Sequence, residues 1–225
     1  MAALAAVSVM AMMFAPVSVP LLSVALQAQA KPPTTPAAPA AKPGTPAKTA
    51  PAKTAAPAPA KPTSGVPQPQ LIVETVKGTI TISLFPDTAP KSVEHILKLV
   101  NRGFYRSQRI SRIVPGQIVQ FGDPQSRDMT LREWWGRGPR SGSGEVIGKA
   151  EISKKHLHTR GAVGLAHPGD ATAADSQMYI TTRALPNLDG KYAVIGQVTS
   201  GMDVVLKLQV TDVIKNVTAK GVPGT

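Results

Sequence analysis

Twelve prolines lie between residues 31 and 70 of the 225-residue chain, mixed mainly with alanine, threonine and lysine. Each proline fixes one backbone angle and removes one hydrogen-bond donor, so neither a helix nor a sheet can propagate through this tract. Its low hydrophobicity leaves no core to bury, and it is predicted to be a disordered, semi-extended linker. A folded domain is therefore expected only in residues 71–225, which are long enough to bury one core.

Residues 1–30 are apolar and small, carry no charged side chain, and end in Ala28-Gln29-Ala30. Signal peptidase cleaves after such a small-x-small ending, so we expect an exported protein, periplasmic or extracellular, whose mature chain begins at Lys31. The alternative is an uncleaved membrane anchor, because about 20 apolar residues suffice to span a bilayer. Pro16 and Pro20 interrupt the apolar run, which favours the cleaved signal peptide.

The formal net charge of the chain is +12, and removing the five lysines of residues 31–70 leaves +7 for residues 71–225. A basic domain can bind polyanions. Its basic residues are mixed with acidic ones along the sequence, however, and no aromatic-basic RNA-binding motif occurs. Specific nucleic-acid binding is therefore not expected. The lysines of the linker either hold the protein loosely near anionic envelope polymers or merely keep the linker soluble.

Other kinds of chemistry find little support in the sequence. The chain has no cysteine, which excludes disulfides, thiolate catalysis and cysteine-ligated zinc. His156 and His158 would lie on one strand face, but two histidines do not complete a metal site, and a basic surface stretch is the simpler interpretation. Asp175 and Ser176 are neighbours that would point to opposite faces of a strand. With no nucleophile-elbow, phosphate-loop or dinucleotide motif either, no metal or cofactor is expected.

Short apolar runs punctuated by glycine, proline and aspartate fill residues 71–225. Leu71 to Phe85 predicts a hairpin around Lys77-Gly78, and Asp87-Thr88-Ala89-Pro90 predicts the capped start of a helix that ends near Gly103. Apolar residues follow at helical spacing within it, namely Val93, Ile96, Leu97 and Val100. Many short strands with only two helices indicate an antiparallel barrel or sandwich. The further strands are predicted at 110–114, 118–121, 162–166, 178–181, 193–198 and 210–214, and the second helix at 202–208.

Five sequence blocks follow one another along this domain. They are Lys77–Ile96, Gly103–Pro124, Arg160–Ala166, Asp175–Ile180, and Leu188–Gly196 with Gly201–Val205 after it. In this order they resemble the cyclophilins, which are peptidyl-prolyl cis-trans isomerases, and in particular an exported bacterial branch. Any single block would be a weak signal, whereas the ordered set covers nearly all of residues 71–214. The resemblance implies an all-β fold with two helices, built as a closed eight-stranded antiparallel β-barrel.

The implied reaction is rotation about a prolyl peptide bond, which C–N resonance opposes with a barrier of about 18–20 kcal/mol. Such an enzyme needs no nucleophile; it must bind the twisted amide, whose nitrogen has become basic, better than either planar form. By the resemblance, Arg112 donates a hydrogen bond to that nitrogen and Gln120 hydrogen-bonds the substrate backbone. Arginine suits the role because it stays charged and presents rigid donors.

The same resemblance assigns the residues that hold the substrate. Ala166 and His167 match positions that pair with the peptide chain. Gln117 stands where the family has a pocket phenylalanine, and replacing a fully buried phenylalanine removes apolar burial worth about 1.5–3 kcal/mol, so a weaker grip on proline is expected. The remaining predicted substrate-binding residues are Ile118, Gln177, Met178, Tyr179, Leu188 and Tyr192. Among them, Met178 and Tyr179 replace phenylalanines of the family, and Tyr192 replaces a histidine.

The sequence therefore predicts a monomeric isomerase without a cofactor that acts on proline-containing segments of exported or unfolding proteins. A non-catalytic module that binds such segments, as a chaperone or scaffold, is the alternative. Arg112 and Gln120 favour the enzyme, whereas the reduced aromatic pocket keeps the binding module open. A third interpretation makes the basic surface and linker a polyanion-binding element. Trp134 and Trp135, in the loop at 124–150, either extend the substrate groove or pack the loop onto the domain.

Overall fold

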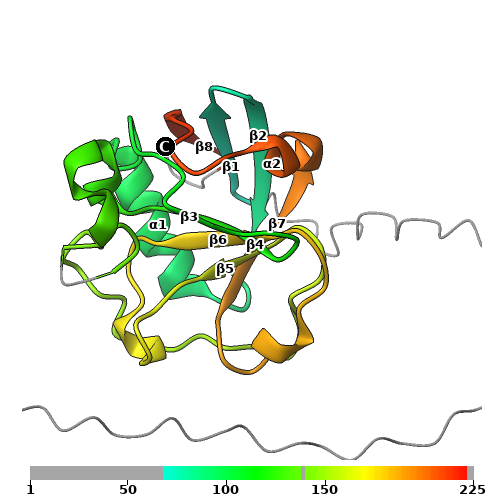
Figure 1. Ribbon diagram of the computed structural model, residues 1–225. Helices are drawn as coiled ribbons and strands as arrows, with labels where there is room; N and C mark the ends of the chain where they lie inside the picture. Colours follow the sequence, from blue (N-terminus) through cyan, green and yellow to red (C-terminus); the bar gives the residue numbers. More distant parts are fainter. Residues whose placement is uncertain (1–67, 138–139, 222–225) are drawn as a thin grey trace, which may run out of the picture. The chain divides into compact units, whose positions relative to one another are not determined.

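The computed structural model describes residues 68–137 and 140–221 of the chain (Figure 1). The predicted signal peptide and almost all of the predicted linker lie outside the described residues. Within the described ranges, no helix has both the length and the apolar character needed to cross a membrane. Gln70 already belongs to the first strand, and the side chain of Gln68 accepts a 2.8 Å hydrogen bond from Ser83. The folded part therefore starts before the predicted boundary at residue 71.

Eight antiparallel strands form one curled sheet in the order β3-β4-β6-β5-β7-β2-β1-β8. The predicted hairpin is confirmed, since β1 and β2 pair directly around Val76-Lys77. The strands are β1 (Gln70–Thr75), β2 (Gly78–Leu84), β3 (Arg112–Val114), β4 (Ile118–Phe121), β5 (Ala162–Leu165), β6 (Met178–Thr181), β7 (Val194–Ser200) and β8 (Ile214–Lys220). The α-helices are α1 (Pro90–Asn101) and α2 (Met202–Lys207), and the 3-10 helices are η1 (Pro124–Arg127), η2 (Met129–Trp134), η3 (Ala171–Ala173) and η4 (Pro186–Leu188).

The prediction of a closed barrel was wrong, because the two ends of the sheet do not pair. Strands β3 and β8 form the edges of an open, curled half-barrel and lie 13 Å apart. The chain segments that precede these two strands meet instead, through one isolated bridge between Arg109 and Val213 and the hydrogen bond from Ile110 N–H to Asp212 O (2.9 Å). Strand β3 has only three residues, so it is too short to extend this contact into a hydrogen-bonded ladder that would close the sheet.

The last strand also begins later than predicted. Residues 210–212 form a turn, in which Thr211 has a positive φ of 84° and the Asp212 carboxylate accepts a hydrogen bond from Gln209 N–H at 2.8 Å. Strand β8 starts only at Ile214 and pairs with β1. The apolar residues at 210–214 were therefore misread as a strand because the turn contains no glycine or proline to mark it.

The core lies between the concave face of the sheet and the buried face of α1. Ile80 and Ile82 of β2 and Ile96 and Leu99 of α1 are all almost completely buried. Helix α1 contacts β8 and helix α2 contacts β2, and the two helices stand well apart in Figure 1. The helical spacing of apolar residues thus predicted the buried face of α1 correctly.

Helix α1 begins at Pro90 as predicted, but the expected side-chain cap is absent, because its N-cap residue is Ala89. The buried carboxylate of Glu151 takes over this role from a distant loop. It accepts hydrogen bonds from the backbone N–H groups of Lys91 (3.2 Å) and Ser92 (2.8 Å). A negative charge at this position also interacts favourably with the helix dipole. Glu151 therefore connects the loop before β5 to the start of α1.

Replacing Glu151 by alanine is expected to lower the free energy of unfolding by about 2–4 kcal/mol, because the buried N–H of Ser92 and the partly buried N–H of Lys91 lose their acceptor. Urea denaturation followed by circular dichroism measures the change. Glu94→Ala is the matched control, since Glu94 is an exposed residue of the same helix and its loss should change stability by less than about 0.5 kcal/mol. Equal losses in the two variants would contradict the capping role of Glu151.

Candidate active site

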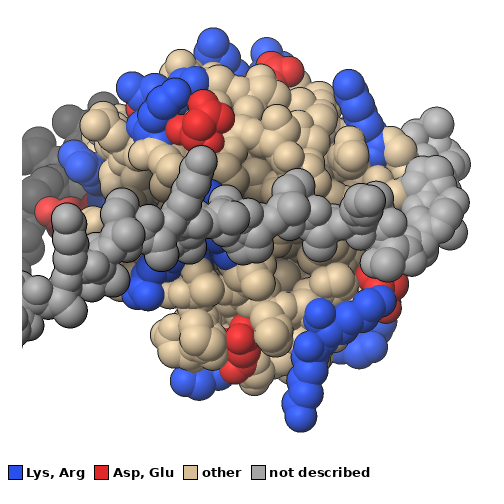
Figure 2. All heavy atoms as spheres, turned by 90° about the vertical axis from the view of Figure 1, so that its right-hand side faces the viewer, with Lys and Arg blue, Asp and Glu red and all other residues tan. Residues whose placement is uncertain are grey.

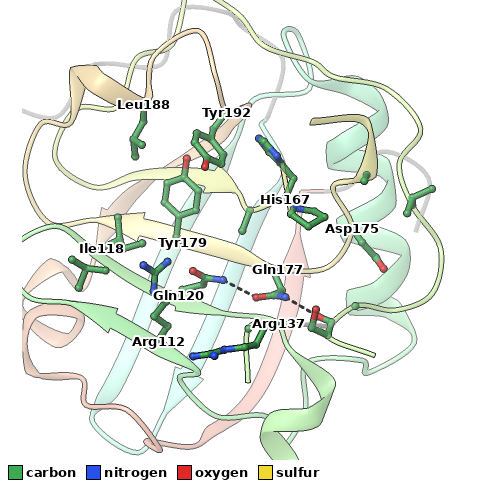
Figure 3. A pocket seen from close by; sticks show the side chains of 18 of the residues that line it. Arg112, Ile118, Gln120, Arg137, His167, Asp175, Gln177, Tyr179, Leu188 and Tyr192 are labelled. Carbon is green, nitrogen blue, oxygen red and sulfur yellow. Dashed lines mark hydrogen bonds between the residues drawn. The ribbon is translucent and has the colours of Figure 1, made fainter. Parts of the chain in front are cut away.

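A groove of about 830 Å³ opens over one face of β3, β4 and β6 and is completed by three loops (Figure 3). Nine of the ten site residues predicted from the sequence line it, although they come from segments up to 80 residues apart. Those nine are Arg112, Ile118, Gln120, Ala166, His167, Gln177, Tyr179, Leu188 and Tyr192.

Strand register explains how the central residues come together. Arg112 of β3 lies opposite Gln120 of β4, and Gln120 lies opposite Tyr179 of β6. Tyr179 in turn lies opposite Gly164 of β5. Residues directly opposite each other in antiparallel strands share one face of the sheet. The four residues therefore form one row across four strands.

Met178 is the predicted site residue that the groove does not include. Its side chain is completely buried in the core, where it packs with residues such as Leu165 and Phe121. Successive side chains of a strand point to opposite faces, so Met178 and Tyr179 cannot both face the groove. The family pattern has phenylalanine at both positions, but in this chain residue 178 lies in the core and residue 179 lies in the groove.

Arg112 is exposed on β3 and lines the groove. Its side chain reaches toward Ile118 and Tyr179 (Figure 3). Within the described part of the chain, its guanidinium makes neither an ion pair nor a hydrogen bond, and all five of its donors remain available. The arrangement can donate hydrogen bonds to a ligand in the groove.

Gln120 is buried beside Arg112 and is held in one orientation by a chain of amides. Its Nε2 donates to Oε1 of Gln177 at 2.7 Å, and Nε2 of Gln177 donates to the carbonyl of Ser141 at 2.8 Å (Figure 3). Such a fixed amide presents its remaining polar atoms to the groove in one geometry. The loop residue Ser141 thereby helps to orient a strand residue of the site.

Tyr179 forms the floor of the groove, and a buried hydrogen-bond chain holds its ring. Nδ1 of His158 lies 2.7 Å from Asp189 Oδ1, and Nε2 of His158 lies 2.8 Å from the Tyr179 hydroxyl. A hydrogen bond from the backbone N–H of His158 lowers the pKa of Asp189. Burial raises the pKa of Tyr179 well above its usual value. An ionised Asp189 therefore accepts from Nδ1–H, and the other ring nitrogen, Nε2, is hydrogen-bonded to the phenol of Tyr179.

Gly164 provides the room for this ring. A Cβ atom at position 164 would lie 2.4 Å from Cζ of Tyr179, closer than any real contact of this kind. Tyr192 closes the slot with its ring at 89° to that of Tyr179 (centroids 5.9 Å apart), and His167 lies against Tyr192 (4.4 Å). Gln117 lines the groove as well, without filling it. The result is an aromatic slot that opens beside Arg112.

His158 was not anticipated as part of the site. The sequence interpretation placed it in a basic surface stretch with His156, whereas it is only 2% exposed and bonded on both ring nitrogens. His156 lies apart from it and stacks on Phe85, with ring centroids 3.7 Å apart. Among the residues that the structure describes, no group of three or more His, Cys, Asp or Glu side chains could hold a metal ion.

The far end of the groove comes from a loop that sequence reasoning left unassigned. This loop is anchored by Asp123, which is buried and accepts hydrogen bonds from Gln125 N–H (2.8 Å) and Gly136 N–H (2.5 Å). Its polar, glycine-rich sequence has no periodicity that could place it in advance. The groove residues of this loop that the sequence did not single out are Gly136, Arg137, Ser141, Gly142, Gly144 and Val146.

The two adjacent tryptophans of this loop have different environments. Trp135 is buried, and its Nε1 donates to the carbonyl of Asp128 at 3.1 Å. Trp134 is 58% exposed. Neither lines the groove, so Trp135 serves to pack the loop onto the domain rather than to extend the groove.

Charged side chains on the face shown in Figure 2 stand in separate groups. Several of the Lys and Arg side chains have Asp or Glu beside them. Elsewhere or on this face, the ion pairs of the described residues include those of Lys98 and Arg102 with Glu145 and that of Lys155 with Asp87. This mixture agrees with the sequence, in which basic and acidic residues alternate.

Comparison with known proteins identifies the family. The model of the family described as "Cyclophilin type peptidyl-prolyl cis-trans isomerase/CLD" matches residues 70–222. A probable peptidyl-prolyl cis-trans isomerase of Brucella suis is 36% identical over 143 residues, which are 64% of this chain and 72% of that protein. Peptidyl-prolyl cis-trans isomerase B of Bacillus subtilis is 34% identical over 142 residues, covering 63% of this chain and 91% of that protein.

Solved structures agree at the level of the fold. A cyclophilin-type isomerase of Cryptosporidium parvum, crystallised in the presence of the dipeptide Ala-Pro, gives a TM-score of 0.58 at 24% identity and covers 67% of this chain and 98% of its own. The cyclophilin AquaCyp293 of Hirschia baltica gives 0.53 at 24% identity, covering 68% of this chain and 74% of its own. On the strength of the family match and the curated relatives, the chain belongs to the cyclophilin-type peptidyl-prolyl cis-trans isomerases.

Proposed function

We propose that Arg112 performs the isomerisation by donating a hydrogen bond to the nitrogen of the twisted prolyl amide. One observation carries the proposal: a guanidinium without a partner among the described residues lies beside an aromatic slot, on the same face of the sheet. In the planar amide the nitrogen lone pair is delocalised and accepts poorly. At the top of the barrier the lone pair is localised on the nitrogen and accepts well. The hydrogen bond is therefore stronger in the transition state than in the planar amide, and this difference lowers the barrier.

The remaining groove residues hold the peptide while one bond turns. The proline ring occupies the slot formed by Ile118, Tyr179, Leu188 and Tyr192. Gln120 receives the peptide backbone. The N–H of Ala166 is already bonded to the Gln177 carbonyl (2.9 Å), so pairing with the peptide falls to the Ala166 carbonyl and the backbone of His167. No bond breaks in this scheme and no proton is transferred.

The substrates in this proposal are Xaa-Pro segments of proteins. Support comes from the size of the groove, which lies in the usual range of ligand-binding pockets, and from the structural relative that was crystallised in the presence of Ala-Pro. The proposal also places the enzyme outside the cytoplasm, where newly exported chains fold. The apolar residues 1–30 with their Ala28-Gln29-Ala30 ending support this setting.

Arg112→Ala is expected to lower kcat/KM on an Xaa-Pro peptide by about a hundred- to a thousandfold, because one charge-stabilising donor is lost from the transition state. Two-dimensional NMR exchange on the peptide measures the rate, and titration measures its affinity, which should fall far less. Arg132→Ala, on η2 and outside the groove, is the control. A wild type that binds the peptide without accelerating exchange would instead support the non-catalytic binding module.

Gly164→Ala is expected to lower kcat/KM by about tenfold or more, because the added methyl displaces the Tyr179 ring from the floor of the slot and overpacking of this kind costs about 1–3 kcal/mol. A double-mutant cycle with Tyr179→Leu isolates this contact. In the Tyr179→Leu background, the glycine substitution should have little further effect. Equal effects in both backgrounds would show that Gly164 acts by some other route.

Expression of the full chain in a bacterium with an export pathway should yield a mature protein that begins at Lys31. The small residues at 28 and 30 direct the cleavage. N-terminal sequencing of protein from the periplasmic fraction tests this, and Ala30→Lys should block the processing. An intact chain that begins at Met1 and stays in the membrane fraction would identify residues 1–30 as an anchor.

A further inference from the structure

We propose that Arg137 makes this enzyme prefer prolyl segments that carry an acidic side chain within about three residues of the proline. The inference deepens the proposed function and rests on it, because the peptide must lie in the groove beside Arg112. It concerns a loop residue that the reaction itself does not require.

Arg137 lines the same groove as Arg112, Gln120 and Gln177. In Figure 3 the Gln120–Gln177 pair occupies the middle of the pocket, with Arg112 and Arg137 on one side of it and Tyr179 and Tyr192 on the other. A peptide that places its proline in the aromatic slot therefore passes near both guanidinium groups.

The backbone that carries Arg137 is held on both sides. Its N–H donates to the carbonyl of Trp134 at 3.0 Å, and its carbonyl accepts from Nε2 of Gln125 at 3.2 Å. The preceding residue, Gly136, is bonded to the buried carboxylate of Asp123. The guanidinium thus projects from a fixed point at the groove and needs no ordering of the backbone to meet a ligand.

The Arg137 side chain is exposed, and in residues 68–137 and 140–221 no carboxylate forms a salt bridge with it. Other arginines and lysines on the surface do have such partners, for example Arg102 with Glu145 at 2.8 Å. A guanidinium left without an anion at the rim of a binding groove can take a carboxylate from the ligand in a bidentate pair.

Asp175 is the one carboxylate among the described residues that line the groove, and its oxygens are already engaged. Oδ1 receives His95 Nε2 (3.0 Å) and the Ser143 hydroxyl (2.5 Å), and Oδ2 receives the N–H of Gly144 (3.0 Å). The Asp175 oxygens therefore already have hydrogen-bond partners within the protein, and one carboxylate stands against two guanidinium groups in the groove. The other ionisable groups of the groove are Arg112, Arg137, His167 and the two tyrosines, so its field is positive.

The positive charge of the groove determines which side chains beside the proline are favoured. A glutamate or aspartate near the proline gains an ion pair, whereas a lysine at the same place faces two cations. An extended peptide advances about 3.3 Å per residue, which with the length of an arginine side chain limits the acidic position to about three residues from the proline. Because the groove is open to water, the pair is partly screened and its contribution is modest.

The test uses a series of peptides with one proline, in which Glu, Ala or Lys occupies each position from three before to three after it. Exchange spectroscopy gives kcat/KM, and fluorescence anisotropy gives Kd for the same peptides. At the best position, Glu should exceed Ala by about three- to tenfold and Lys should fall below Ala. In Arg137→Gln the ratio of Glu to Ala should approach one, and in Arg137→Glu it should invert in favour of Lys.

Arg132→Gln is the matched control, because it removes the same charge from an exposed residue outside the groove and should keep the wild-type ratio. The wild-type ratio should also decline at about 1 M NaCl. A ratio near one at every position, or a preference that survives Arg137→Gln, would overturn the inference and leave the isomerase proposal intact. A wild type that does not accelerate the all-alanine peptide would overturn the proposed function instead, and the Kd ratios would then still decide the role of Arg137.

Discussion

The register between four short strands is the constraint on which the site depends. Arg112, Gln120, Tyr179 and Gly164 face one another pairwise across β3, β4, β6 and β5. Because side chains alternate along a strand, a slip of one residue in any of these ladders would move its member of the row from the groove to the core. The hydrophobic residues between them, Val119 and Ile180 among others, pack inward and so fix the register. The core thereby positions the guanidinium of Arg112 beside the aromatic slot.

Much of the fold could be predicted from the sequence, because local patterns determine it. The hairpin, the buried face of α1, and strands β4 and β6 lie where the patterns predicted. The closed barrel, which the resemblance implied, was wrong because the edge strands β3 and β8 do not pair. The last strand was misplaced because the turn at 210–212 contains no glycine or proline to mark it. Helix α1 shows a further limit of local patterns, as its N-terminus is capped by Glu151, about 60 residues away.

The predicted site residues were obtained from family blocks, and the structure brings nine of them together while placing Met178 in the core. The family blocks could not show that some residues of this chain depend on one another for space and for hydrogen bonds. A tyrosine at 179 needs space at 164 and a partner for its hydroxyl, and Gly164 and His158 supply them from different segments. Taken singly, each of the three residues is an unremarkable glycine, histidine or tyrosine. Together they keep a polar aromatic ring in an otherwise apolar floor.

The strands and the loops of this groove contribute different properties. Strand residues present the guanidinium and the aromatic floor, whose positions must be fixed because the transition state gains only from well-placed donors. In the proposed scheme, Arg137 of the adjoining loop supplies charge at the groove, where an ion pair tolerates small displacements. Since a loop can change without disturbing the strand register, a preference of this kind can be altered independently of the proposed role of Arg112. The hydrogen bond from Gly136 N–H to the carboxylate of Asp123 connects the two parts, because it holds the loop against the end of β4.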